Sequence, residues 1–265
     1  MQCWLVRFAQ QRIITARVIS TLCRYPMNKP PHSNEATRRK PLGAIGCLAM
    51  MVLGVIFSAS AIRTTPPSAK RYQCQNNLKQ IALAILNYDS ANGHLPPLMS
   101  LAEDGTPLHS WRIHILPFLE ETDLYEKIDL NLPWNHPANL ALQDDMPTVY
   151  RCPSFSDEDY STAYVAPAGQ NTVWMAGKPR KIREVTKGTS KTGLVIEAEQ
   201  FRQHWMSPFD PQIAEFVATS EDGMQLNPSN HGKRIQLVYV DGSIEVLSGD
   251  TEPERIRHLF EMAAD

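Results

Sequence analysis

The chain has 265 residues, of which 43% are hydrophobic, and a formal net charge of -2. This composition supplies enough apolar side chains for a core and excludes a disordered protein. Residues 1–40 contain eight basic residues and one acidic residue and have a net charge of +7, so the rest of the chain has -9. An acidic body offers no footprint for nucleic acid, and we expect no nucleic-acid partner.

Residues 1–41 are predicted to form a basic cytoplasmic tail, within which Met27 is an alternative start of the chain. Residues 42–62, which begin with Leu42 and end with Ile62, contain no charged side chain. A helix of this length rises about 30 Å, which matches the hydrocarbon core of a bilayer. Because residues 38–40 are all basic, we expect them to stay in the cytoplasm. The sequence therefore predicts a single-pass protein of the inner membrane with a periplasmic C-terminal domain.

A cleaved signal peptide remains open as an alternative to a permanent anchor. Residues 58–61 are small and have the spacing that a signal peptidase uses. The apolar run is long for a signal peptide, however, which favours the anchor.

A long helix is the first element predicted outside the membrane. Residues 63–71 contain two prolines and are predicted to be a hinge, with Ser68 as the N-cap of the next helix. In residues 69–91, apolar side chains recur at spacings of three and four, which predicts an amphipathic helix with one buried face that ends at Gly93. These apolar residues are Leu78, Ile81, Ala82, Ile85 and Leu86.

The following elements of the domain, residues 72–265, are shorter. Residues 111–115 alternate between apolar and polar side chains and predict an extended segment, and a helix is predicted over 118–128. We expect a loop at 133–135 and a short helix over 137–143. Short strands are predicted over 148–152, 163–167 and 193–198.

A hairpin and a closing helix are predicted near the C-terminus. Asp241 and Gly242 lie between the apolar runs 235–240 and 243–247, which predicts a hairpin with a two-residue turn. Residues 252–264 predict the last helix. One long helix followed by a mostly antiparallel sheet gives an α+β fold.

Several ordered blocks between residues 72 and 248 carry a resemblance to a known family. They include residues 73–80 (QCQNNLKQ), 93–97 (GHLPP), 110–112 (SWR), 116–120 (LPFLE), 150–154 (YRCPS), 186–190 (TKGTS), 231–232 (HG) and 240–243 (VDGS). These blocks resemble the planctomycete domain of unknown function 1559 family, which is also labelled bacterial solute-binding-protein-like. Members of that family look like pilins or pseudopilins, so the resemblance implies a long helix packed on a mostly antiparallel, pilin-like sheet.

The chain departs from the family at its N-terminal segment. Residues 42–55 lack the Gly-Phe-Thr-Leu-x-Glu processing signal of that family, and two prolines at 66 and 67 interrupt the helix that would continue from the membrane. Pilin-type processing and filament assembly therefore stay open.

Cys74 and Cys152 both fall inside the resembling blocks and on the exported side of the anchor. In an oxidising compartment such a pair is usually a disulfide, which we predict here. Closing a loop of about eighty residues stabilises a fold by roughly 4 kcal/mol in the chain-entropy model. Two separate buried thiols are the alternative, and metal binding by two thiolates alone is less favoured.

Catalytic signatures are missing from the sequence. It contains no Gly-x-Ser-x-Gly elbow, no His-Glu-x-x-His motif, no phosphate loop and no dinucleotide fingerprint, and we predict no catalytic, cofactor or metal site. Three residues are weak functional candidates. His231 and Asp241 could approach one another as metal ligands or as a base, although a turn also explains Asp241. Glu197 ends a predicted strand, where an ion pair at the sheet edge is the alternative.

The predicted function is a membrane-anchored, non-enzymatic extracytoplasmic module for assembly or interaction at the cell envelope, with protein partners or copies of itself. The first alternative is a domain that binds a small solute or glycan, since Trp111, Trp134 and Trp174 either pack in the core or receive a sugar or peptide. A hydrolase built on His231 is the second alternative. Complete burial of the apolar face of helix 69–91 within one chain would argue against filament packing through that face.

Overall fold

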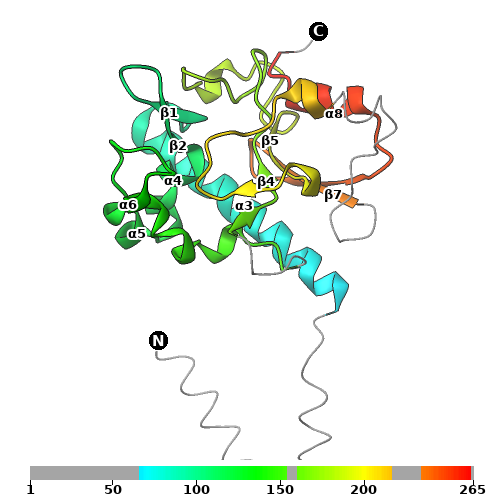
Figure 1. Cartoon of the computed structure of the whole chain (residues 1–265). Coiled ribbons are helices and arrows are strands. Elements are labelled where there is room, and N and C mark those ends of the chain that lie inside the picture. The colour runs from blue at the N-terminus through cyan, green and yellow to red at the C-terminus, as the bar shows by residue number, and fades with distance from the viewer. Residues whose placement is uncertain (1–65, 154–159, 217–233, 264–265) are drawn as a thin grey trace, which may run out of the picture. The chain divides into compact units, whose positions relative to one another are not determined.

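The computed structural model of the chain describes residues 66–153, 160–216 and 234–263 (Figure 1). The predicted tail, the segment 42–62 and His231 lie outside these residues. Among the described residues, no helix is long and apolar enough to cross a membrane.

The described chain contains five α-helices, five short 3-10 turns and eight strands. The helices are α3 (Pro67–Asn92), α4 (Trp111–His114), α5 (Thr122–Lys127), α6 (Pro137–Leu140) and α8 (Pro253–Phe260), with short 3-10 turns η1 (Leu116–Leu119), η2 (Gln143–Asp145), η3 (Thr148–Tyr150), η4 (Ile182–Glu184) and η5 (Glu199–Phe201). The strands are β1 (Met99–Leu101), β2 (Pro107–Ser110), β3 (Ser161–Thr162), β4 (Tyr164–Val165), β5 (Gly193–Glu197), β6 (Gln203–His204), β7 (Arg234–Tyr239) and β8 (Ile244–Ser248).

The predicted long helix is confirmed as α3. Pro67 occupies its first turn, where a missing N–H costs nothing and the fixed φ suits a helix. The N-cap is Pro66 and makes no side-chain cap, so the prediction of Ser68 as the N-cap is wrong, and residues 67–71 of the predicted hinge are helical. Gly93 ends the helix in the left-handed region at φ 76°, and its N–H donates to the carbonyl of Asp89 over 2.7 Å.

The main sheet has the strand order β4-β5-β7-β8, and every neighbouring pair is antiparallel, as predicted. Alternate residues face opposite sides of it. Val195 and Val238 belong to the core on the side of α3, whereas Ile196 and Leu237 belong to a second core that includes Phe260 of α8. The sheet therefore lies between α3 and α8, which is an α+β arrangement in three layers (Figure 1).

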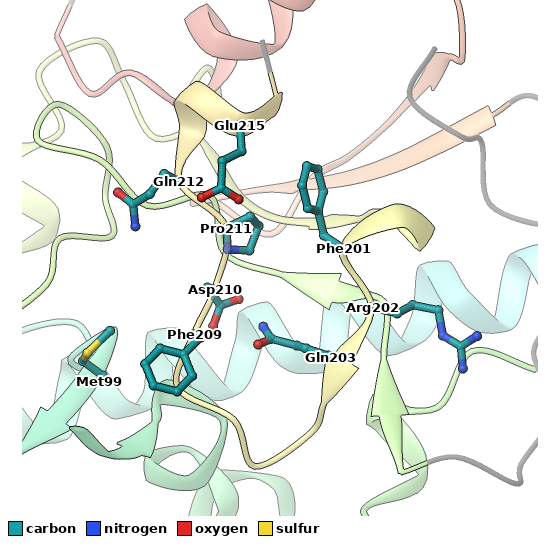
Figure 2. A pocket seen from close by; sticks show the side chains of 9 residues that line it. All are labelled: Met99, Phe201, Arg202, Gln203, Phe209, Asp210, Pro211, Gln212 and Glu215. Atoms are coloured by element: carbon teal, nitrogen blue, oxygen red, sulfur yellow. The ribbon is translucent and has the colours of Figure 1, made fainter. Parts of the chain in front are cut away.

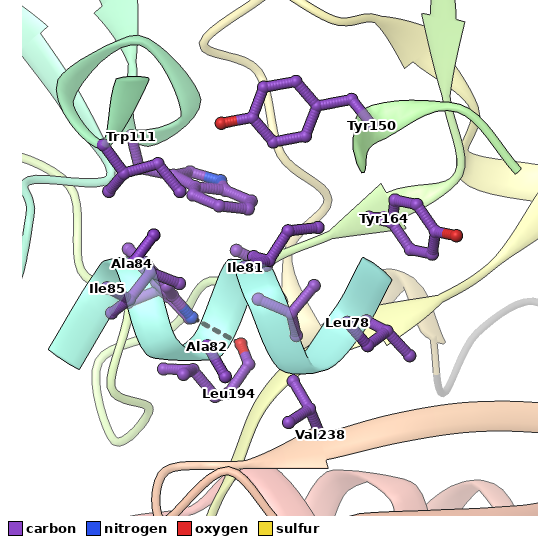
Figure 3. Close-up of a cluster of buried hydrophobic side chains, with 14 of the residues drawn as sticks. Leu78, Ile81, Ala82, Ala84, Ile85, Trp111, Tyr150, Tyr164, Leu194 and Val238 are labelled. Atoms are coloured by element: carbon purple, nitrogen blue, oxygen red, sulfur yellow. Dashed lines mark hydrogen bonds between the residues drawn. The ribbon is translucent and has the colours of Figure 1, made fainter. Parts of the chain in front are cut away.

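Figure 3 shows how the apolar face of α3 fills the larger core. Leu78, Ile81 and Ile85 are completely buried. They pack among side chains from the sheet and from the region around α4, including Val238 and Trp111 (Figure 3). Burial of one such side chain stabilises the fold by roughly 1.5–3 kcal/mol, so this face commits α3 to the domain.

A lobe made of β1, β2 and the elements from α4 to η3 contributes side chains to this core, and three segments of it differ from the predictions. Residues 111–114 form the helical turn α4 instead of an extended segment, because Ser110 acts as its N-cap and accepts the N–H of Arg112. The strand comes earlier, as β2. Residues 148–150 form the 3-10 turn η3 instead of a strand. The predicted helix 118–128 is divided into η1 and α5 by Glu120, which has φ 64°.

The C-terminal hairpin β7–β8 is confirmed, but its turn is longer than predicted. Tyr239 N–H donates to the carbonyl of Ser243, and Gly242 N–H donates to the carbonyl of Tyr239, each over 2.9 Å. Three residues therefore lie between the paired positions, and Gly242 alone among them takes positive φ, at 83°. This is the geometry of a three-residue loop that ends in a glycine.

Candidate functional site

Cys74 and Cys152 meet in the core. Cys74 lies on the buried face of α3, four positions before Leu78, and is completely buried. Cys152 follows η3 and is 5% exposed. The two sulfur atoms lie 2.8 Å apart. Chain folding thus brings together residues that are 78 positions apart in sequence.

The spacing of the sulfurs suits the predicted disulfide better than a bound metal. A disulfide bond has a length of about 2.05 Å, so these sulfurs need to approach by less than ~1 Å. Two thiolates on one tetrahedral zinc ion lie about 3.8 Å apart, given Zn–S bonds of about 2.3 Å. The disulfide itself stays a prediction.

Glu197 lies beside this cysteine pair. Its strand, β5, is an inner strand between β4 and β7, so Glu197 does not lie at a sheet edge, which the alternative of an ion pair there required. The side chain is completely buried on the α3 side, and its Oε2 accepts a hydrogen bond of 2.7 Å from Gln236 Nε2 on β7. The carboxylate and the two sulfurs offer three donor atoms that all lie within 4.8 Å of one another.

Tyr164 completes a polar row across the sheet. It pairs with Glu197 in the antiparallel register of β4 and β5, and its hydroxyl accepts a hydrogen bond of 3.3 Å from the side chain of Asn77 on α3. Burial, together with the nearby Glu197 carboxyl and the two cysteines, raises the pKa of Tyr164 well above its ordinary value of 10. The phenol therefore remains neutral and can only donate or accept hydrogen bonds.

Asp241 has a local structural role. Its Oδ1 accepts the backbone N–H of Ser243 over 2.9 Å and the hydroxyl of Ser243 over 2.6 Å, which is the ordinary use of an aspartate in a turn. The suggested approach of Asp241 to His231 is not tested, since His231 lies outside the described residues.

Two of the three tryptophans discussed above are core residues. Trp111 is completely buried and Trp174 is 1% exposed, with their ring centroids 5.3 Å apart. Trp174 donates its indole N–H to the carbonyl of Leu194 over 2.6 Å. Trp134 is partly buried and packs against the ring of His204. Neither buried tryptophan can serve as a platform for a sugar.

A separate groove lies on the surface and has a volume of about 500 Å³ (Figure 2). Its rim carries Phe209, which is 60% exposed, and its lining includes the exposed polar residues Gln212 and Glu215. Gln203 points toward Phe209, whereas Arg202 points away and donates to the hydroxyl of Ser161 (Figure 2). The remaining lining residues are Met99, Phe201, Asp210 and Pro211.

Asp210 in the groove lining is tied to the core by a buried ion pair. Arg112 forms a two-pronged contact with it, from Nη2 to Oδ1 over 2.7 Å and from Nη1 to Oδ2 over 2.9 Å. Trp111 Nε1 and the backbone N–H of Ala166 also donate to the same carboxylate, over 3.1 and 2.7 Å. Arg112 in turn donates to the carbonyl of Tyr164. The pair thus joins α4, β4 and the segment that forms the groove.

Sequence reasoning missed most of these partners. Arg112 lies in the resembling block 110–112, which was a signal, but nothing in the sequence pointed to Asp210 as its partner. Gln236 is a polar residue inside an apolar run, and this break in the pattern is the signal that could have marked it as a partner of a buried group.

Residues 67–172 match the model of a family described as Protein of unknown function (DUF1559). The chain is therefore similar to that family from α3 to just beyond β4, and Glu197, Asp210 and the C-terminal hairpin lie outside the matched range. No curated protein and no solved structure matches the chain.

Proposed function

We propose that this chain is a single-pass inner-membrane protein whose periplasmic domain acts without catalysis, by binding other components of the cell envelope. The observation that carries the proposal is the Cys74–Cys152 pair, with buried sulfurs 2.8 Å apart. A cysteine pair in this position is a stabilising crosslink in an oxidising compartment and is rarely crosslinked in the cytosol. The uncharged segment 42–62 after a basic triplet supports the same topology.

The burial of α3 favours interaction over filament assembly. Leu78, Ile81 and Ile85 are completely buried within one chain and Leu86 is partly buried, so this face has little apolar surface left for a neighbouring subunit. A module that acts as a single folded domain fits this burial better than a pilin-like subunit that packs through the same face.

Fractionation of the native protein tests this proposal. We expect the chain in the membrane fraction, with an intact N-terminus by N-terminal sequencing and a shift in mobility between non-reducing and reducing gels. The shift should disappear in Cys152→Ser. A mature chain that starts within residues 43–49 and is found in sheared surface material would restore pilin-type processing. A soluble chain with both thiols open to alkylation would overturn the proposal.

The groove supports a second candidate function, the binding of a small solute or a glycan. Its volume of about 500 Å³ lies within the usual range for ligand sites, ~300–1,000 Å³. The exposed ring of Phe209 offers a stacking surface beside the amide of Gln212 and the carboxylate of Glu215, and sugars are bound by such combinations.

Calorimetric titration of the purified protein with neutral disaccharides tests this second candidate. Phe209→Ala should weaken binding at least tenfold, or ~1.4 kcal/mol, whereas Leu83→Ala should not, because Leu83 is equally exposed but lies on the outer face of α3. Equal affinity in the two variants, or the absence of binding to the wild type, would remove this candidate.

A further inference from the structure

The carboxyl group of Glu197 is the least expected feature of the core. A disulfide between Cys74 and Cys152 needs no acid beside it, and a carboxyl group taken out of water costs free energy unless it is hydrogen-bonded, paired or bound to a metal. Glu197 is completely buried, and its Oε2 accepts a hydrogen bond of 2.7 Å from the side-chain amide of Gln236. Because its carboxylate and the two sulfurs lie within 4.8 Å of one another, the acid is placed to act together with the sulfurs.

The three side chains form a recognisable donor set. Two thiolates and one carboxylate oxygen are ligands that zinc accepts in proteins, at about 2.3 Å for sulfur and 2.0–2.2 Å for oxygen. Their donor atoms already lie within 4.8 Å of one another. They come from α3, from the chain after η3 and from β5, so an ion bound by all three would join the helix to the sheet. Zinc is usually four-coordinate, so three protein ligands leave one position for a water molecule.

We propose that Cys74, Cys152 and Glu197 bind one thiophilic divalent cation of the zinc class when the two cysteines are reduced, and that oxidation of the cysteines to a disulfide releases it. This inference uses the same cysteine pair as the proposed function and adds a second state to it. In the reduced state each thiol gives up its proton to solvent, and the sulfurs separate from 2.8 Å to about 3.8 Å to accommodate the ion.

The oxidation of the two cysteines requires an oxidant, which is a second disulfide that reacts by thiol–disulfide exchange. One thiolate attacks the oxidant and forms a mixed disulfide, and the second thiolate displaces it. The sulfur–sulfur bond of Cys74 and Cys152 forms, two electrons pass to the oxidant, and the oxidant leaves as two thiols after it takes up protons. The ion then keeps only the carboxylate as a ligand and dissociates.

Two neighbouring polar side chains, Tyr164 and Gln236, are placed to orient the ligands of this site. The neutral phenol of Tyr164 lies next to the cysteines and Glu197, and Gln236 holds the carboxylate by a hydrogen bond of 2.7 Å. Groups of this kind orient metal ligands in proteins. Tyr164 and Gln236 are therefore positioning residues, and neither is a ligand.

The test uses the full chain in which Cys3, Cys23 and Cys47 are replaced by Ser, so that only the two domain cysteines remain. After reduction without oxygen, we expect cadmium to produce a thiolate-to-metal charge-transfer band that saturates at one ion per chain. Glu197→Gln should weaken cadmium binding at least tenfold, Cys152→Ser should abolish the band, and Glu199→Gln should change neither. Addition of a small-molecule disulfide should release the ion to a chelating dye.

A second measurement keeps the proposal testable if Glu197→Gln does not fold. X-ray absorption of the zinc-loaded wild-type site should show two sulfur neighbours and at least one oxygen neighbour. The proposal is overturned if the reduced chain gives no saturable band, if the oxidised chain binds the ion equally well, or if Glu197→Gln binds as tightly as the wild type. Such a failure leaves the membrane location and the disulfide untouched, because fractionation and gel mobility test them separately.

Discussion

Replacement of Asp210 by alanine should destabilise the domain more than any exposed charge substitution. Its carboxylate accepts two hydrogen bonds from Arg112, one from Trp111 and one from the backbone of Ala166. The side chains of Arg112 and Asp210 are both completely buried. Removal of the acid leaves a guanidinium group in the core without its counter-charge, because Arg112 cannot lose its proton.

The magnitude follows from this burial. Breaking a buried ion pair from one side costs about 3–5 kcal/mol, and we expect about 4 kcal/mol for Asp210→Ala. At a urea dependence of ~2 kcal/mol per molar, this corresponds to a decrease of about 2 M in the unfolding midpoint. Tryptophan fluorescence should follow the transition, since Trp111 contacts the altered position.

Glu254→Ala is the matched control. Glu254 pairs with Arg257 over 2.7 Å, but these side chains are 58% and 42% exposed, so the loss should stay below about 1 kcal/mol. If Asp210→Ala unfolds at the same urea concentration as Glu254→Ala, the ion pair does not hold the lobe, the sheet and the groove together, and the reasoning fails.

Three further predictions concern other parts of the domain. Cys74→Ser should lower the free energy of unfolding by roughly 4 kcal/mol in non-reducing buffer and by far less when reductant is present, as urea unfolding in the two buffers would show. Burial, with a smaller contribution from nearby His109, lowers the pKa of His114 from 6.5 to about 4. Between pH 6.5 and 4, the His114 side chain therefore binds a proton in the unfolded chain but not in the folded chain. The free energy of unfolding should fall by up to about 3 kcal/mol as the pH drops through this range, and His114→Gln should reduce this dependence on pH. Gly193→Ala should cost about 1–3 kcal/mol by thermal unfolding, because its new Cβ would lie 2.9 Å from the ring of Phe260, and unchanged stability would show that the ring can move.

Local patterns in the sequence predicted those elements whose stabilising interactions are local or periodic. The apolar spacing of α3, the left-handed Gly93 after it and the alternation on both sides of Asp241 each depend on nearby residues, and each predicted element exists. The prediction of an extended segment over 111–115 was wrong for the opposite reason. Its alternation suggested a strand, but the cap at Ser110 and burial on all sides turn it into a helical turn, and tertiary packing is not encoded in a short window.

The candidate site could be predicted only as separate parts. Cys74 and Cys152 were paired from their compartment, and Glu197 was noted as the end of a strand. The strand order was needed to show that β5 is an inner strand and that its face toward α3 carries the acid to the sulfurs. Asp210 was not noted at all, because its partner Arg112 is 98 positions away.

The two buried polar clusters are linked through strand β4. Arg112 donates to the carbonyl of Tyr164, and Tyr164 lies opposite Glu197 in the register of β4 and β5, so the ion pair and the cysteine site share one strand. A change in the sulfur separation near β4 therefore acts on a strand that also supports Asp210 in the groove lining. Rigid packing transmits such displacements, because cores have little free volume. The redox state of Cys74 and Cys152 is consequently the variable to control when ligands are tested at the groove.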